Sequence, residues 1–360
     1  MISQRATRIE PGYGAELRDC RMLVVGGAGF VGSNLVRHAL SLGCSSVVIV
    51  DNLLSSEEDN VPGDARVSLL KGPAGDSRVL AMIRDDFDYV FHLATFHGNQ
   101  NSIADPLADH EHNVFTTLRL YEHLKGFRRI RKVVYAASGC TLAPHTFEQA
   151  EPVLEDGPVP LELDSPYQIS KVVGEFYSVY YCRQHGLPTV RARFQNVYGP
   201  GEILGAGQWR GTAATVWRNV TPTFVYRAIK RLPLQVENEG RASRDFIYVD
   251  DVVRGLVACA LKGTAGGVYN LASGVETAIL ELATTINRMT DNPIPIEYMP
   301  RRAWDHAGKR VGSTVKALNE LGFSASVSLE QGLEATIRWT KDNLPLIERC
   351  IARHAGRMAA

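Results

Sequence analysis

Short apolar runs alternate with helical stretches through the first half of the chain. The first run, residues 21–25, ends at a glycine-rich turn. Apolar residues then recur at helical spacing over 33–40, and 46–50 is a second run, rich in valine. This order of strand, glycine turn, helix and strand predicts a βαβ unit. Residues 1–20 are polar and irregular, so we expect an extension that precedes the fold.

Three further apolar runs continue the pattern, at 89–93, 132–137 and 188–193. Their alternation with helical segments predicts an α/β fold with a doubly wound parallel sheet of the Rossmann type. Ligands of such sheets bind at the carboxyl ends of the strands. We therefore expect the functional residues to follow these runs directly.

The pattern changes beyond Asn196. Residues 199–222 are rich in Gly, Thr, Trp and Arg without clear periodicity, which is typical of a long functional loop. Strands are expected at 245–249 and 267–271, around a helix at 250–262. The predicted division is a sheet domain, 21–196 with about 245–270, and a smaller carboxyl-terminal α/β lobe, 197–244 with 271–345.

Composition and charge exclude several classes of protein. The 360 residues are 45% hydrophobic and 22% charged, as expected for a globular protein with a large core. Lys+Arg and Asp+Glu are both 39, so no overall field attracts nucleic acid or an anionic membrane. The six cysteines lack metal or disulfide spacing, and no signal peptide or long apolar span is seen. We expect a cytoplasmic protein without a metal site.

The glycine turn has the form Gly26-x-x-Gly29-x-x-Gly32, a variant of the dinucleotide fingerprint. Glycines there let a pyrophosphate approach backbone N–H groups at a helix start. Asp51 follows the second strand, where a carboxylate accepts hydrogen bonds from the adenosine ribose and repels the 2′-phosphate of NADP. NAD is therefore the expected cofactor. Asp76 is a candidate for the adenine amine, or a solvated loop residue.

Tyr167 and Lys171 lie four residues apart, on one face of a predicted helix that starts near Asp164-Ser-Pro166. A tyrosine acts as an acid or base near neutral pH only if its pKa is lowered. Lys171 and the positive nicotinamide would both favour the phenolate. Ser138, at the end of a strand, would orient the substrate oxygen. The alternative is a packed tyrosine and a surface lysine.

Several motifs together resemble one family, the extended short-chain dehydrogenase/reductases that modify nucleotide sugars. The resemblance covers residues 21–345 and rests on the segments 24–33, 50–52, 91–94, 165–171, 193–200, 244–250 and 269–274. It implies that Tyr167 takes the proton of the sugar 4-OH while the C4 hydride moves to NAD, giving a 4-keto sugar. It also implies a nucleotide-diphosphate sugar as substrate and a homodimer formed by helices near 113–125 and 166–185.

The resemblance assigns further site residues. Asn196 would contact the diphosphate or the sugar, Arg244 would pair with the diphosphate, and Asn113 would lie near the nicotinamide. His92 would have a structural position beside the cofactor. The expected cofactor-binding set is Gly26, Gly29, Phe30, Val31, Gly32, Asp51, Asn52, Asp76, Leu93, Ala94, Asn113, Tyr167 and Lys171.

Ser138-Gly139-Cys140 bears on which reaction follows the ketone. By resemblance, 4,6-dehydratases carry Asp and Glu at positions 139 and 140, and glucuronate decarboxylases carry Glu at the second. Neither carboxylate is present, which favours 4-epimerisation, as in the UDP-hexose and UDP-N-acetylhexosamine 4-epimerases. GDP-mannose 3,5-epimerase has a cysteine base at the place of Cys140, although its partner lysine has no evident match here. Cys140 is therefore either a base or a small inert side chain.

The loop at 199–218 is longer than the family usually has and is expected to cover the nucleotide and the sugar. Trp209 and Trp217 would stack on a base while Arg210 and Arg218 neutralise phosphate, or both tryptophans would anchor the loop. No arginine of the kind found in some uronate-handling relatives occurs near 97–100. Its absence disfavours a glucuronate substrate.

Three hypotheses follow. The first is an NAD-dependent nucleotide-sugar 4-epimerase. The second is another reaction of the same ketone: C3/C5 epimerisation with Cys140 as base, decarboxylation or dehydration. The third is an NAD-binding sensor or scaffold without turnover, which the intact Ser138, Tyr167 and Lys171 disfavour.

Overall fold

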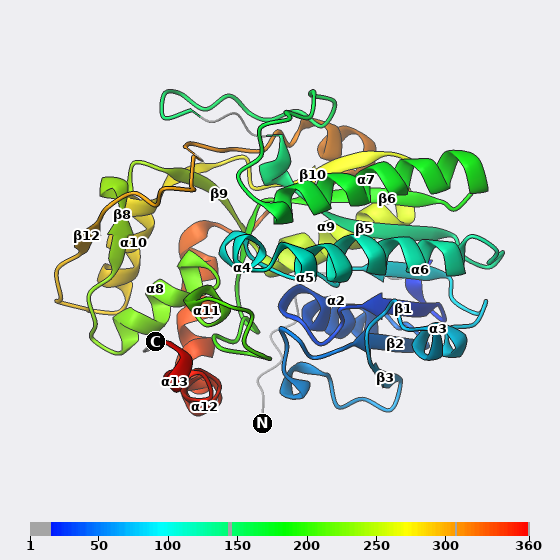
Figure 1. Ribbon diagram of the computed structural model, residues 1–360, viewed down its shortest axis with the longest axis horizontal. Helices are drawn as coiled ribbons and strands as arrows, with labels where there is room; N and C mark the ends of the chain where they lie inside the picture. Colours follow the sequence, from blue (N-terminus) through cyan, green and yellow to red (C-terminus); the bar gives the residue numbers. More distant parts are fainter. Residues whose placement is uncertain (1–15, 143–145, 307, 359–360) are drawn as a thin grey trace.

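A seven-stranded parallel sheet forms the centre of the larger part of the molecule (Figure 1). The structure, a computed structural model, describes residues 16–142, 146–306 and 308–358. Most of the predicted extension, 1–15, lies outside these residues. In spatial order the strands are β10 (Val268–Leu271), β6 (Thr189–Phe194), β5 (Lys132–Ser138), β4 (Tyr89–His92), β1 (Arg21–Val25), β2 (Ser46–Asp51) and β3 (Val67–Lys71).

The strand order reverses between β1 and β4. The chain moves outward from β1 through β2 to β3, and then returns to place β4 on the other side of β1. Such a switch point opens a crevice at the carboxyl ends of the two strands, where doubly wound folds bind ligands. The predicted glycine turn follows β1 and lies at this crevice. The Rossmann-type fold predicted from the sequence is confirmed.

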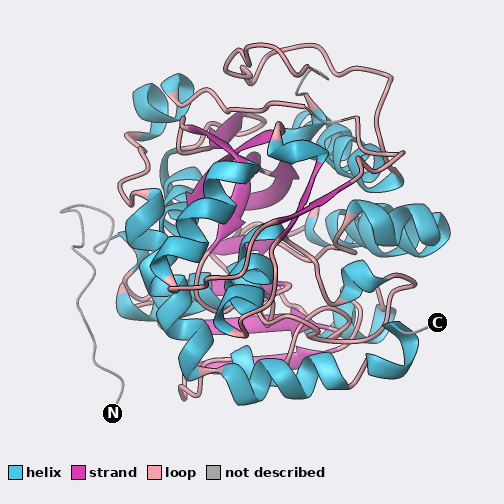
Figure 2. Cartoon of the chain, turned by 90° about the vertical axis from the view of Figure 1, so that its left-hand side faces the viewer, coloured by secondary structure: helices cyan, strands magenta, loops and turns pink. Residues whose placement is uncertain are grey.

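Helices cover both faces of the sheet (Figure 2). Leu35 of α2 (Phe30–Ser41) and Leu256 of α9 (Val249–Lys262) belong to one core cluster. Leu120 and Tyr181 belong to the cluster on the other face. That face carries α3 (Ser77–Met82), α6 (Thr116–Leu124) and α7 (Pro166–His185). The strands are therefore buried from both sides, which explains their nearly continuous apolar runs.

Helix α7 starts and ends where local capping signals predict. The Ser165 side chain accepts a hydrogen bond from Gln168 N, and Pro166 occupies the first turn. Gly186 ends the helix with φ 69°, a left-handed conformation that suits glycine. Tyr167 consequently lies in the first turn of α7, as expected.

A smaller lobe packs beside the sheet and has its own apolar core. Its helices are α8 (Val220–Ile229), α10 (Ile279–Met289) and α11 (Leu329–Asp342). Its strands form two small sheets, one of β7 (Asn196–Tyr198), β9 (Ser243–Tyr248) and β11 (Glu276–Ala278), the other of β8 (Gln235–Glu237) and β12 (Glu297–Met299). Strand β9 was expected in the sheet domain, but it pairs with β7 and β11, while β10 joins the large sheet. The division into two domains stays a proposal.

Shorter helices complete the fold. The segment before α6 contains α4 (Asn99–Ala104), α5 (Pro106–His110) and a π-helical turn, Glu111–Phe115. Helices α12 (Leu344–Ala352) and α13 (Ala355–Met358) end the described chain. Within the described ranges, no helix combines the length and apolar character that crossing a membrane requires.

Candidate active site

A cavity of about 730 Å³ lies at the carboxyl ends of the central strands. Its wall includes the glycine turn after β1, the segment after β4 and the end of β5. Residues of the smaller lobe, among them Phe224 and Arg244, line it as well. The cavity therefore joins the crevice of the sheet to the second lobe.

The glycine turn is packed too closely for side chains. Gly26 has φ +86°, and a Cβ there would lie 2.5 Å from Ala94 N. A Cβ on Gly32 would lie 2.2 Å from Gly26 O. Asp51 braces the turn because its Oδ2 accepts a hydrogen bond of 3.0 Å from Ala28 N. The turn thus presents its backbone to the cavity at the start of α2.

Most of the predicted cofactor residues line this one cavity. They are Gly26, Gly29, Phe30, Val31, Gly32, Asp51, Asn52, Leu93, Ala94, Tyr167 and Lys171. Asp76 does not line it: its carboxylate caps α3, accepting from Arg78 N at 2.8 Å. Asn113 does not line it either, because its Oδ1 accepts from Phe96 N at 2.7 Å and its Nδ2 donates to Asp109 at 2.8 Å. Asn113 therefore braces the cavity wall from behind.

Lys171 is buried rather than a surface residue, with 3% exposure. Its Nζ donates to Ala136 O at 3.0 Å and lies 5.8 Å from the centre of the Tyr167 ring. Burial lowers the pKa of Lys171 from its ordinary value of 10.5 to about 8. The phenol and the ammonium therefore converge on one end of the cavity, as the four-residue spacing predicts.

The pKa of Tyr167 depends on its burial and on its neighbours. Burial raises the pKa of Tyr167 above its ordinary value, with a smaller contribution from Cys140, while a hydrogen bond with Ser138 lowers it. Desolvation of the phenolate is the largest of these effects. The expectation that Lys171 and the positive nicotinamide together favour the phenolate stays a prediction.

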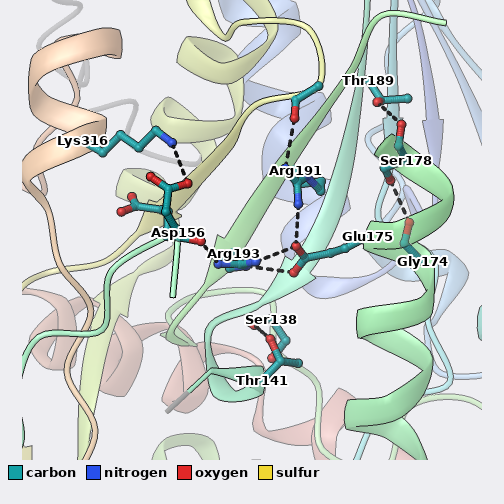
Figure 3. Close-up of polar contacts among 12 residues, drawn as sticks. Ser138, Thr141, Asp156, Gly174, Glu175, Ser178, Thr189, Arg191, Arg193 and Lys316 are labelled. Atoms are coloured by element: carbon teal, nitrogen blue, oxygen red, sulfur yellow. Dashed lines mark hydrogen bonds and ion pairs between the residues drawn. The ribbon is translucent and has the colours of Figure 1, made fainter. Parts of the chain in front are cut away.

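A buried ion pair positions α7 against β6 (Figure 3). Arg193 Nε and Nη2 donate to the two carboxylate oxygens of Glu175 at 2.8 and 2.7 Å. Glu175 lies four residues after Lys171 on α7, so the pair orients the helix that carries the proton-transfer groups. Glu175 was not predicted from the sequence as a positioning residue, although its spacing of four residues from Lys171 places both side chains on one face of the helix.

Gly139 and Cys140 differ in their surroundings. A Cβ on Gly139 would lie 2.2 Å from Gln195 Nε2. Cys140 lines the cavity, and its Sγ lies 2.9 Å from Ser138 Oγ. The thiol is therefore hydrogen-bonded to the hydroxyl that also contacts Tyr167.

The loop at 199–218 packs on the segment that follows Asp51. Arg210 Nη1 donates to Leu54 O at 3.1 Å, and Arg218 Nη1 donates to Ser55 O at 2.7 Å. Trp209 packs against His354 with ring centroids 5.9 Å apart. Trp209 and Arg210 lie outside the cavity wall, so their predicted contact with the substrate stays a prediction. Trp217 and Arg218 do line it.

The predicted substrate residues Asn196 and Arg244 both line the cavity. Burial, followed by the neighbouring Arg310, lowers the pKa of Arg244 to about 10. Sequence reasoning missed Arg310, and also His97, whose ring centroid is 6.1 Å from that of Tyr167. Burial lowers the pKa of His97 to about 3, so it is neutral at physiological pH.

His92 has a structural position in the core. His92 Nε2 lies 2.8 Å from Thr117 Oγ1 in the buried core behind the cavity. Throughout the described part of the chain, no three His, Cys, Asp or Glu side chains cluster as a metal ion would require.

The residues present fit a dinucleotide. A close-packed glycine turn at a helix start, a carboxylate after β2 and the Tyr167–Lys171 pair all line one cavity. Comparison with known proteins agrees. In the NADH complex of the Bordetella bronchiseptica enzyme WbmF, 57% of residues are identical, with a TM-score of 0.87 over 96% of this chain and 99% of that chain. WbmF has also been solved with NAD⁺ and UDP.

Two relatives are named for different reactions, one for epimerisation and one for decarboxylation. A UDP-glucose 4-epimerase of Mycolicibacterium smegmatis is 30% identical over 89% of this chain and 99% of its own length. A UDP-glucuronic acid decarboxylase of Arabidopsis thaliana is 29% identical over 91% of this chain and 71% of its own length. The NAD dependent epimerase/dehydratase family matches residues 22–272. The chain therefore belongs to this family of enzymes and uses NAD.

Proposed function

We propose that the protein is a nucleotide-sugar 4-epimerase. Tyr167 takes the proton of the sugar O4, Ser138 donates a hydrogen bond to that oxygen, and Lys171 stabilises the phenolate. When bound, NAD would supply the redox step as acceptor and donor of the C4 hydride. The sugar would present its other face between the two proton transfers, and Tyr167 then returns the proton to O4. The product is the C4 epimer, with no net oxidation.

The environment of Gly139 carries this proposal. The side-chain amide of Gln195 occupies the space into which residue 139 would project. Residues 139 and 140, next to Ser138, are a glycine and a cysteine, so neither supplies the carboxylate that elimination of water would use there. Proton transfer at O4, by contrast, needs only groups that already lie together: Ser138, Tyr167 and Lys171.

The names of the relatives support a UDP-sugar as substrate. WbmF was solved with UDP, and a relative from Mycolicibacterium smegmatis is named a UDP-glucose 4-epimerase. Asn196 and Arg244 line the cavity, where they would contact the sugar or the diphosphate. Arg244 would supply the positive charge for this group.

Product analysis in D₂O tests the proposal. The purified protein is incubated with UDP-glucose, UDP-N-acetylglucosamine, UDP-glucuronate and their C4 epimers, and each carbon is followed by NMR. We expect inversion at C4 without deuterium at C3, C4 or C5, because the hydride does not exchange with solvent. Tyr167→Phe should lower the rate about 10²- to 10⁴-fold, since the proton acceptor is lost. Conversion of none of the sugars would favour an NAD-binding protein without turnover.

One observation favours a second candidate, C3/C5 epimerisation. Cys140 lines the cavity and its Sγ is hydrogen-bonded to Ser138, so its thiol could reach the carbon atoms that a 4-ketone would acidify. Deuterium at C3 or C5 would identify this reaction. Decarboxylation, named for the Arabidopsis relative, would convert UDP-glucuronate to a UDP-pentose with loss of CO₂.

We also propose that the protein is a cytoplasmic homodimer. Ile169, Phe176 and Tyr180 lie on one exposed face of α7, with exposures of 51%, 60% and 50%. Leu107 and Phe115, on the neighbouring helical segments, are also exposed. Two copies of this apolar surface would pack as a four-helix interface. Neither nucleic acid nor a membrane is an expected partner.

A further inference from the structure

Arg310 is a buried cation in the wall of the active-site cavity. It is 7% exposed. Its segment of the chain is held in place by backbone hydrogen bonds, from Val153 N to Val311 O at 2.9 Å and from Ser313 N to Val153 O at 3.0 Å. These bonds fix the backbone from which the Arg310 side chain reaches the cavity wall.

Two donors of Arg310 have no hydrogen-bond partner. Both Nε and Nη2 are buried and unpaired. Asp164 Oδ2 forms an ion pair with Nη2 at 3.9 Å, a separation that is too long for a hydrogen bond. A buried guanidinium with unused donors is costly unless an acceptor completes it. An anionic group of a ligand in the cavity would do so.

The surroundings place Arg310 at the sugar end of the cavity. Asp164 directly precedes Ser165, the cap of the helix that carries Tyr167. Two residues after Arg310, a Cβ on Gly312 would lie 2.7 Å from Gln195 Nε2, and the same amide fills the space beside Gly139. Arg310 is therefore close to the strand end where Ser138 and Tyr167 meet.

Arg310 is also close enough to Arg244 to contribute to the lowered pKa of Arg244. Both arginines line the cavity, and Asp164 beside Arg310 supplies one counter-charge. If Arg244 pairs with the diphosphate, the hexose ring lies between the diphosphate and Tyr167. Arg310 would then meet a substituent of the ring itself.

From these contacts we propose that Arg310 binds a carboxylate on the hexose, so that the preferred substrate is a nucleotide-linked hexuronic acid. Nε and Nη2 form the side of the guanidinium that matches the two oxygens of a carboxylate. The inference rests on the proposed function and adds its substrate class. The sequence had disfavoured a uronate because residues 97–100 contain no arginine. The cation comes instead from a distant part of the chain.

A matched pair of ligands tests this inference. UDP-glucuronate and UDP-glucose differ only at C6, and UDP lacks the sugar. Binding of all three is measured by calorimetry on the NAD-loaded protein, and kcat/KM is measured for the two sugars.

Wild-type protein should prefer the uronate. Arg310→Gln should weaken the uronate about 100-fold, because a buried charge pair is broken, while the affinity for UDP stays within about threefold. Lys309→Gln, outside the cavity wall, controls for the loss of one positive charge.

The outcomes separate the possible roles of Arg310. Equal losses for the uronate, glucose and UDP ligands in Arg310→Gln would assign the residue to the diphosphate and overturn the inference. An unchanged ratio of uronate to glucose affinity would also overturn it. Binding is measured without turnover, so a protein that selects the uronate but epimerises neither sugar would contradict only the proposed reaction.

Discussion

The side-chain amide of Gln195 lies between Gly139 and Gly312. A Cβ on Gly139 would be 2.2 Å from Gln195 Nε2, and a Cβ on Gly312 would be 2.7 Å from it. The amide thus packs against both glycines, and Gln195 also lines the cavity. This packing occupies the position from which an acid or base at residue 139 would act.

Gly139→Ala should destabilise the protein through overpacking, by about 1–3 kcal/mol in the free energy of unfolding. In a Gln195→Ala background the same change should cost less, because the amide no longer blocks the methyl group. Urea unfolding of the four proteins measures this coupling. Gly126→Ala, at a glycine with no atom within 4 Å of the added Cβ, is the control. Equal costs in both backgrounds would contradict the contact.

Cys140→Ser should keep turnover within about threefold of wild type. A serine hydroxyl can exchange a hydrogen bond with Ser138 as the thiol does, and the proposed reaction takes no proton to Cys140. Initial rates and deuterium incorporation are measured together. A large loss of rate, accompanied by loss of deuterium at C3 or C5, would instead identify the thiol as a base.

The free energy of unfolding should depend on pH because the pKa of Lys171 is lowered in the folded protein. Its pKa is about 8 in the folded protein and 10.5 in its ordinary state. Between these values the unfolded chain binds more protons, so this group makes the free energy of unfolding rise with pH. Lys171→Met should remove that rise. Denaturant unfolding from pH 7 to 10 compares the two proteins, and parallel curves would show that burial does not shift Lys171.

Glu175→Gln should destabilise the protein by about 3–5 kcal/mol, because it leaves Arg193 buried without a counter-charge. The two side chains are each 5% exposed. The exposed pair Arg338 and Glu334, four residues apart on α11, offers a matched control. Glu334→Gln should cost less than about 1 kcal/mol. Similar losses for the two variants in thermal or urea unfolding would contradict the positioning role of Glu175.

Phe176→Glu should convert the proposed dimer into a monomer, since it places a charge in the apolar face of α7. Light scattering after size-exclusion chromatography measures the mass. Leu318→Glu changes a residue of similar exposure, 52%, away from that face and should leave the mass unchanged. A monomeric wild-type protein would refute the dimer directly.

Local patterns explain what could be predicted from the sequence. The strands, the glycine turn and the start of α7 follow from periodicity and capping over a few residues, and most predicted cofactor residues line one cavity for this reason. The roles predicted for Asp76 and Asn113 stay predictions, and both side chains are hydrogen-bonded to neighbouring residues outside the cavity wall. Strand β9 was misplaced because an apolar run does not specify its pairing partner.

By itself, the sequence determined the parallel α/β fold, the dinucleotide turn and the spacing of Tyr167 and Lys171, since each depends on residues close together in the chain. Only the tertiary structure decided what surrounds them. The raised pKa of Tyr167 reflects burial by the assembled fold. The packing of Gln195 against Gly139 and the unpaired donors of Arg310 arise where distant segments meet. Desolvation and long-range packing set these properties, and neither has a periodic signature in the sequence.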